Sequence, residues 1–211
     1  YSADFKRDRQ LWQNRLELGY GLTKNDGKSA RKTNDKIYFA STYGYQIYKT
    51  LYWSALLNFN TQFAKGYDYN IEDSDFISKF MAPGYLMIGT GVTWSPNKIF
   101  TATFTPASWR GTIVADSRLS DEGAFGVDKG KHLLSEFGAN LKAEVNYEFL
   151  PNMKVYSRLE LYSNYLKDPQ NIDVRWEVQL NMAINKWFST TLSTNLLYDN
   201  DVKIAQDDGT A

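Results

Sequence analysis

Apolar side chains occupy alternate positions along much of this chain. Between Leu133 and Phe149 the odd-numbered positions are mostly apolar and the even-numbered ones mostly polar, and residues 172–185 show the same alternation with their even positions apolar. A period of two places apolar side chains on one face of a β-strand and polar ones on the other. The pattern recurs in residues 11–23, 36–47, 51–63, 84–95, 153–165 and 187–199, and more weakly in 99–115. With a short strand at 1–6, it predicts ten strands.

The connections between these strands alternate in length. Short ones lie near residues 8–10, 48–50, 96–98, 150–152 and 185–187, and longer ones at 24–35, 64–83 and 116–132. The connection near 167–170 is an exception, because it is short although it falls at the long-loop end. Short turns at one end and long loops at the other are typical of outer-membrane β-barrels. A soluble β-sandwich or lipocalin-like barrel would share the alternation of residues.

Large aromatic side chains on the apolar face cluster near the two ends of the predicted strands. At the short-turn end are Trp12, Trp53, Trp94, Phe100, Phe149 and Phe188, and at the long-loop end are Tyr20, Phe39, Phe63, Tyr165 and Tyr198. A strand that rises about 3.3 Å per residue at a tilt near 40° climbs about 25 Å between Trp53 and Phe63, which is the height of the apolar band of such barrels. We therefore predict an all-β protein, an antiparallel up-and-down transmembrane β-barrel in which residues 1–211 form one domain, trimmed at both ends.

Composition narrows the class of protein further. Lys plus Arg and Asp plus Glu both number 24, so no basic surface indicates binding to nucleic acid. The chain has no cysteine, which excludes disulfides and thiolate chemistry. A transmembrane helix needs about 20 consecutive apolar residues. The longest uncharged stretch, residues 80–97, is interrupted by prolines and glycines.

Charges of both signs share the polar face of the predicted strands, which would be the lumen of a barrel. We expect a charge ladder there, made of Arg15, Glu17, Lys142, Glu144, Glu148, Lys154, Arg158, Glu160, Arg175 and Glu177. A tight turn at 150–152 sets Glu148 opposite Lys154, Glu144 opposite Arg158 and Lys142 opposite Glu160, and extension to the next strand brings Arg175 near Glu160 and Glu177 near Arg158. A selective ion pore would favour one sign. The ladder therefore favours a stiffened, charge-compensated lumen, with a lined permeation path as the alternative.

Candidate catalytic and ligand-binding residues are few. His132 is the only histidine and follows Lys131 in a predicted loop, and no orienting carboxylate or nucleophile can be placed beside it. The clusters Asp199-Asn200-Asp201 and Asp207-Asp208-Gly209 lack the spacing of a calcium loop. We therefore expect no enzyme activity, no cofactor and no metal site.

Several segments resemble an outer-membrane protein family of Bacteroidota known as domain of unknown function 3078. They are LELGYGL (16–22), LLNFNTQFAKGYD (56–68), MAPGYL (81–86), GAFGVDKG (123–130) and, above all, SNYLKDPQNIDVRWEVQLNMAINKWFSTTLSTNLLYDND (163–201). The resemblance implies an outer-membrane barrel with a cleaved signal peptide. The aromatic clusters and the alternation of loop lengths predict long loops outside the cell and short turns in the periplasm. The resemblance also implies one strand before Tyr1 and one after Ala211, hence 12 strands in the full-length barrel. It supplies no catalytic residues.

These expectations lead to three functional hypotheses. The first is a non-enzymatic structural or accessory subunit of an outer-membrane assembly, in contact with outer-membrane lipid and lipopolysaccharide and with other outer-membrane proteins or surface lipoproteins as candidate partners. The second is a narrow, porin-like channel for small solutes. The third is a barrel hydrolase that uses His132. The first is favoured because the charges of the polar face compensate one another and no catalytic constellation can be assembled.

Overall fold

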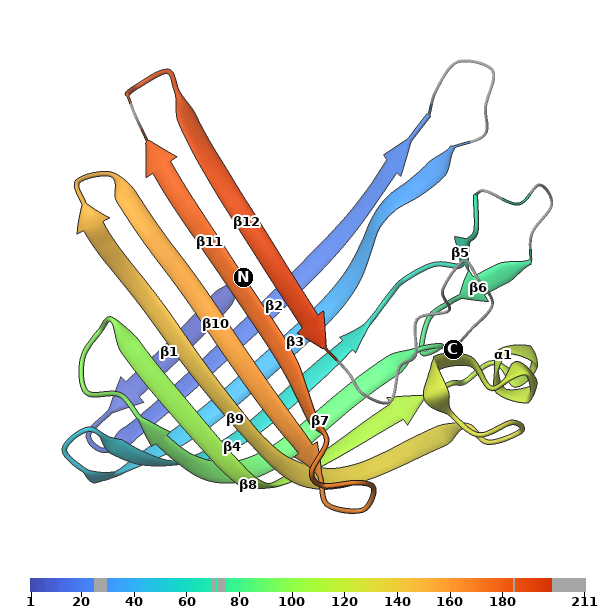
Figure 1. Cartoon of the computed structure of the whole chain (residues 1–211), viewed down its shortest axis with the longest axis horizontal. Coiled ribbons are helices and arrows are strands. Elements are labelled where there is room, and N and C mark those ends of the chain that lie inside the picture. The colour runs from blue at the N-terminus through green and yellow to red at the C-terminus, as the bar shows by residue number, and fades with distance from the viewer. Residues whose placement is uncertain (25–29, 70, 72–74, 184, 199–211) are drawn as a thin grey trace. The chain divides into compact units, whose positions relative to one another are not determined.

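The computed structural model describes residues 1–24, 30–69, 71, 75–183 and 185–198, which form an all-β protein with one α-helix (Figure 1). Ten antiparallel strands make one sheet in the order β1-β2-β3-β4-β7-β8-β9-β10-β11-β12. Their bounds are β1 Ser2–Arg7, β2 Gln10–Thr23, β3 Arg31–Tyr48, β4 Leu51–Thr61, β7 Gly84–Trp94, β8 Phe100–Ile113, β9 Leu133–Leu150, β10 Met153–Asn164, β11 Ile172–Ala183 and β12 Ser189–Tyr198. The ten strands expected from the sequence are thus confirmed. No helix in the described part of the chain is long and apolar enough to cross a membrane.

The sequence predicted a closed barrel, but the ten strands form an open sheet. Strands β1 and β12 are the two ends of the sheet and are not paired with each other. Within the described part of the chain, each of them therefore has one edge that pairs with no further strand.

Tight turns join several neighbouring strands, and they contain residues that tolerate a positive φ. Asp8 (φ 50°) lies between β1 and β2, and Asn152 (φ 66°) lies between β9 and β10. Asp and Asn adopt this conformation more easily than most residues, which suits a two-residue hairpin turn. In the β9–β10 hairpin Met153 pairs with Leu150 and Lys154 with Glu148, so Phe149 forms a one-residue bulge. The bulge preserves the register predicted for the charged residues.

Two of the predicted loops contain regular structure that the sequence pattern does not indicate. The segment between β4 and β7 forms a small hairpin of β5 (Gly66–Tyr67) and β6 (Phe76–Ser78), and the segment between β8 and β9 contains α1 (Ser117–Glu122) and the 3-10 helix η1 (Ala124–Gly126). Asp116 caps α1 by accepting a hydrogen bond from Leu119 N at 3.0 Å, and Gly123 ends it in the left-handed conformation. β3 also begins earlier than predicted, because Arg31 pairs with Thr23.

The chain divides into two compact units, and the boundaries fall inside β3, β4, β7, β8 and β9. Unit 1 contains Tyr1–Tyr45, Ser54–Gly89 and Trp109–Glu136, and unit 2 contains Gln46–Trp53, Thr90–Ser108 and Phe137–Ala211. The expectation that the chain is one domain stays a prediction.

Unit 1 holds a small buried apolar cluster formed by the segments that connect the strands. Ala82, Val114, Leu119 and Val127 are almost fully buried, with Phe76, Ala124, Phe125 and Leu134 packed against them. Figure 1 shows β5, β6 and α1 beside the same end of the strands. This cluster, hereafter the loop core, therefore holds the long connections together and is separate from the exposed apolar face of the strands.

Candidate functional site

The charged residues of β9, β10 and β11 lie opposite one another in the predicted register. The cross-strand pairs are Glu148 with Lys154, Glu144 with Arg158, Lys142 with Glu160, Arg158 with Glu177, and Glu160 with Arg175. All five pairs join opposite charges, and such pairs stabilise neighbouring strands. The predicted register is confirmed.

Within this cluster the direct partner of Arg158 is Glu177, on β11. Arg158 Nη2 lies 2.5 Å from Glu177 Oε2, and the two side chains are 28% and 32% exposed. The sequence analysis had set Arg158 opposite Glu144 and near Glu177. Glu144 lies 3.3 Å from Lys142 and accepts a hydrogen bond from the Tyr156 hydroxyl at 3.0 Å. Because Lys142 and Tyr156 already contact the Glu144 carboxylate, the Arg158 guanidinium pairs with the Glu177 carboxylate on β11.

A smaller group of the same kind lies on β2 and β3 in unit 1. Glu17 forms an ion pair with Arg15 on its own strand and a second one with Lys36 on β3, where Lys36 Nζ lies 2.6 Å from Glu17 Oε2. One carboxylate thus bridges two cations. Arg15 and Glu17 belong to the predicted ladder, and Lys36 joins them.

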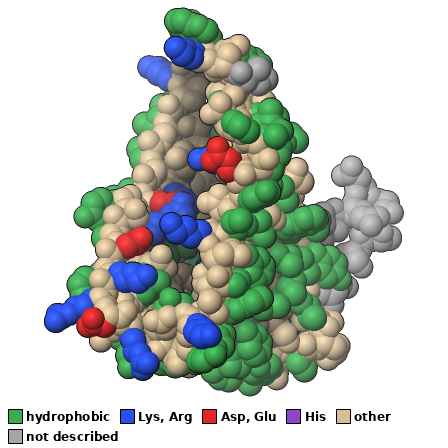
Figure 2. Space-filling view, turned by 90° about the vertical axis from the view of Figure 1, so that its left-hand side faces the viewer, with side chains coloured by type: hydrophobic (Ala, Val, Ile, Leu, Met, Phe, Trp, Pro, Cys, Tyr) green, Lys and Arg blue, Asp and Glu red, His purple; other side chains and the backbone are tan. Residues whose placement is uncertain are grey.

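The predicted aromatic residues are mostly exposed. This holds for Trp12, Trp53, Trp94, Phe149, Phe188, Tyr20, Phe63, Tyr165 and Tyr198, while Phe39 and Phe100 are partly buried. Some use their polar atoms locally, as Trp12 Nε1 donates to Ser41 Oγ at 2.9 Å and the Tyr165 hydroxyl donates to Pro106 O at 3.0 Å. On the side of the molecule that Figure 2 shows, hydrophobic side chains gather in patches apart from most of the acidic and basic ones.

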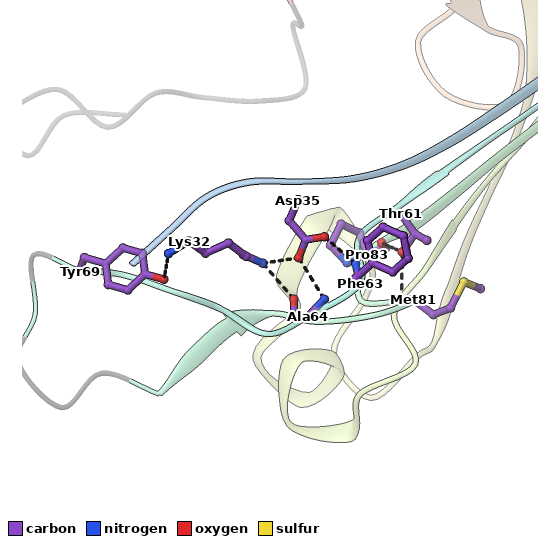
Figure 3. Close-up of polar contacts among 8 residues, drawn as sticks. All are labelled: Lys32, Asp35, Thr61, Phe63, Ala64, Tyr69, Met81 and Pro83. Carbon is purple, nitrogen blue, oxygen red and sulfur yellow. Dashed lines mark hydrogen bonds and ion pairs between the residues drawn. The ribbon is translucent and has the colours of Figure 1, made fainter. Parts of the chain in front are cut away.

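A buried ion pair in unit 1 was not predicted from the sequence (Figure 3). Lys32 Nζ lies 2.7 Å from Asp35 Oδ2, with only 13% and 3% of the two side chains exposed. Asp35 also accepts hydrogen bonds from Phe63 N at 2.7 Å and Ala64 N at 3.0 Å, and Lys32 donates to Ala64 O at 2.9 Å. The pair, hereafter the latch, therefore ties the segment after β4 to the start of β3.

The latch lies on the face of the sheet that carries aromatic residues. Asp35 pairs with Tyr20 across β2 and β3, and directly paired residues point to the same face. The sequence analysis assigned residues 24–35 to a loop, so these charges were not considered part of a strand. The alternation of residues could have placed Asp35, because it lies two residues before Ile37 and four before Phe39 and so falls on the same face as they do.

The loop core is flanked by a second set of charges. Lys79 Nζ lies 2.5 Å from Asp116 Oδ2, and the Arg118 guanidinium lies 4.4 Å from the centre of the Phe76 ring. The hydrogen bond from Lys79, followed by that from the Leu119 backbone, lowers the pKa of the Asp116 carboxyl below its ordinary value of 3.8. The ionised carboxylate therefore caps α1 and joins it to the end of the β5–β6 segment.

The remaining candidates of the sequence analysis are the possible catalytic residue His132 and two acidic clusters. His132 is exposed, and its Nδ1 lies 2.7 Å from Val114 O. The clusters at 199–201 and 207–209 lie outside the described residues. Within the described ranges, no group of three or more His, Asp or Glu side chains could hold a metal ion.

Comparison with known families gives two partial matches. Residues 1–67 match a family model described as a protein of unknown function (DUF3078), and residues 106–209 match one described as a protein of unknown function, DUF481. The match to the DUF3078 model is thus found over the first third of the chain, and this model is described only as one of unknown function. The 163–201 segment lies in the part that matches the second model. No curated protein and no solved structure matches the chain.

Proposed function

We propose that this chain belongs to an integral outer-membrane β-barrel with a non-enzymatic, structural or accessory role in an outer-membrane assembly. The observation that carries the proposal is the contrast between the two faces of β9. Phe137, Leu141 and Tyr147 are exposed on one face, whereas Lys142 and Glu144 are engaged with each other on the opposite face. Apolar side chains outside and paired charges inside are the arrangement of a membrane barrel.

Energetics support a lipid environment for the exposed apolar face. A soluble sheet buries its apolar face against a second layer. Among the described residues, the almost fully buried hydrophobic side chains are Ala82, Val114, Leu119, Val127 and Tyr162. Meanwhile β2 alone exposes Trp12, Leu16, Leu18, Tyr20 and Leu22. Burial of such side chains stabilises each by about 1.5–3 kcal/mol, and lipid can provide it.

A bilayer also requires partners for the two sheet edges. Unpaired backbone groups in hydrocarbon cost several kcal/mol each. The proposal therefore includes further strand pairing on β1 and β12, as in the 12-stranded barrel that the resemblance implies. The long connections then lie at the cell surface beside lipopolysaccharide, and the short turns lie in the periplasm.

Charge compensation favours the structural role over the channel. Each of the five cross-strand pairs on β9, β10 and β11 joins an acidic to a basic side chain, so these pairs carry no excess of positive or negative charge. The channel remains the second candidate because of one observation, namely that Arg158 and Glu177 are about one-third exposed and so are reached by water. A hydrated polar face is compatible with a narrow path for small neutral solutes.

Cell fractionation tests the membrane proposal. We expect the full-length protein in the outer-membrane fraction, resistant to extraction by urea and solubilised by detergent. Recovery in the soluble fraction without detergent would contradict it. Planar-bilayer recording then separates the two roles, since a stable, reproducible open state would favour the channel. Electrical silence together with co-purifying outer-membrane subunits would favour the accessory role.

A further inference from the structure

Two short turns of unit 2 share a sequence and a structure. The β7–β8 turn contains Asn-Lys-Ile-Phe at 97–100, and the β11–β12 turn contains Asn-Lys-Trp-Phe at 185–188. In each turn the Asn Oδ1 accepts hydrogen bonds from the backbone N–H groups two and three residues later, at 2.9 Å in the first turn and 2.8 Å in the second. Such a side-chain cap orders a turn. The lysine and the apolar residue after it are therefore held at the tip of the turn.

The short turns of unit 2 carry basic side chains that are not compensated. Lys49 lies in the β3–β4 turn, Lys98 in the β7–β8 turn and Lys186 in the β11–β12 turn, and all three are exposed. Within the described part of the chain, no acidic side chain pairs with any of them. In the remaining short turn, between β9 and β10, Lys154 lies 3.5 Å from Glu148. The first three lysines, hereafter the basic rim, therefore leave an excess of positive charge.

Each lysine of the basic rim has an exposed apolar neighbour in the chain. These neighbours are Tyr48, Ile99 and Trp187, and Trp187 is 96% exposed. Figure 1 shows the four short turns of unit 2 at the left of the view, the side that faces the viewer in Figure 2. Trp and Tyr are enriched where a bilayer meets water, and a lysine there keeps its stem on apolar groups and its ammonium in water. The pairs therefore suit an amphiphilic surface.

The basic rim lies farther along the strands than the tryptophans of the short-turn end. Lys49 precedes Trp53 by four residues, and Lys98 follows Trp94 by four. Four residues at about 3.3 Å each and a tilt near 40° span no more than about 10 Å of height. The headgroup layer on each side of the hydrocarbon core is about 5–8 Å thick. With the indoles at the edge of the hydrocarbon, the ammonium groups therefore reach the level of the lipid phosphates.

We propose that the basic rim binds the phosphates of anionic glycerophospholipids in the leaflet that surrounds the short turns. Each ammonium contacts a headgroup phosphate, and the apolar residue beside it lies among the glycerol and upper acyl groups. The three lysines lie on three different turns, and a leaflet reaches all of them, whereas an acidic protein bound at one turn would leave the others uncompensated. This inference rests on the proposed membrane role and names the class of lipid that the protein selects.

Electron spin resonance of spin-labelled lipids tests the proposal on the full-length protein in phosphatidylcholine vesicles. It compares the fractions of labelled phosphatidylglycerol and labelled phosphatidylcholine that the protein immobilises. We expect a preference for phosphatidylglycerol of about two- to fourfold at low salt. It should largely vanish in about 0.5 M NaCl, because salt screens exposed charges. Equal immobilisation of the two lipids would overturn this inference and leave the membrane role standing, whereas immobilisation of neither would overturn both.

Substitutions link the lipid preference to the basic rim. The triple variant Lys49→Gln, Lys98→Gln and Lys186→Gln should lose most of the preference while still immobilising phosphatidylcholine, which shows that it is inserted. Lys98→Gln and Lys186→Gln alone should each lose part of it. The matched control Lys129→Gln removes an exposed lysine from the long connection before β9 and should keep the preference of the parent. A preference that survives the triple substitution would overturn the assignment.

The same triple variant separates a lipid from a protein partner. Parent and variant are purified from native membranes, and the proteins that accompany each are compared. Loss of an acidic protein from the variant, together with an unchanged preference for phosphatidylglycerol, would show that the basic rim binds protein and would overturn the proposal.

Discussion

Arg158 on β10 and Glu177 on β11 face each other in register and form an ion pair, with Nη2 and Oε2 2.5 Å apart. The pair lies on the face of the sheet opposite the exposed apolar side chains. Since about a third of each side chain is exposed, its contribution should fall between that of a fully buried pair and that of a surface pair.

Arg158→Ala should lower the free energy of unfolding of the detergent-refolded protein by about 1–3 kcal/mol, because it leaves Glu177 without its partner. Adding Glu177→Ala should recover part of this loss, and adding Glu144→Ala should recover less. Denaturant unfolding, followed by tryptophan fluorescence, measures the free energy of unfolding of the single variant and of the two double variants. Equal recovery from both second substitutions would show that Arg158 does not select Glu177.

The Glu148–Lys154 pair provides a matched control on the neighbouring hairpin. Its atoms are 3.5 Å apart, and the side chains are 50% and 59% exposed. A double-mutant cycle on this pair should give a coupling of about 0–1 kcal/mol.

The latch should control the order of the segment after β4. Asp35→Asn leaves the Lys32 ammonium in a largely buried site without its counter-ion and weakens the bonds to Phe63 N and Ala64 N. We expect faster hydrogen exchange at these two amides and a loss of about 2–4 kcal/mol of stability. Lys32→Met in the same chain should recover part of the stability. Unchanged exchange in Asp35→Asn would contradict the role of the latch.

The stability of the loop core should depend on acid pH through Asp116. Its pKa is lowered on folding by Lys79 and by the Leu119 amide, so the ionised form is favoured in the folded state. Its contribution is then fully present above the ordinary pKa of 3.8 and is lost as the pH falls through the lower folded value.

Asp116→Asn should keep the helix cap but lose the ion pair, which lowers stability at neutral pH by about 1 kcal/mol. The difference between variant and parent should shrink as the pH falls below 3.8. Thermal melts between pH 7 and 2.5 measure it, with Asp121→Asn on the exposed side of α1 as the control. A difference that persists undiminished at pH 2.5 would rule out titration of Asp116 as the cause.

Membrane topology can be tested with single cysteines, because the chain has none of its own. Lys131→Cys lies in the long connection before β9, and Asn97→Cys lies in the short turn between β7 and β8; both positions are exposed. An impermeant maleimide added to intact cells should label the first and not the second. Both should be labelled after lysis, and the reverse pattern on intact cells would invert the proposed orientation.

The sequence predicted the strands and their register well, for a definite physical reason. In β9 and β10 the period of two fixes which side chains share a face, and a turn at Pro151 and Asn152 fixes the register that sets Arg158 opposite Glu144. The short connection between β10 and β11 sets Arg158 opposite Glu177. The choice between the two carboxylates could not be predicted, since it depends on the engagement of Glu144 by Lys142 and Tyr156.

The loop regions were predicted least well. Contacts such as those of Asp35 with Phe63 and Ala64 join residues that are far apart in sequence and have no common period. The short helix α1 depends on a cap at Asp116 and on burial of Leu119, which only the folded loop core provides. The closed barrel expected from the sequence is not formed by these ten strands, because periodicity identifies strands but not which edges meet.

The most direct test of the membrane proposal is the depth of two tryptophans in a bilayer. Single-tryptophan proteins that retain only Trp53 or only Trp176, both exposed, are reconstituted into vesicles whose lipids carry bromine at chosen depths. The proposal predicts that bromines near the headgroups quench Trp53 most strongly, that bromines near the bilayer centre quench Trp176 most strongly, and that aqueous iodide quenches neither. Quenching of both tryptophans by iodide, with no effect of the brominated lipids, would contradict it.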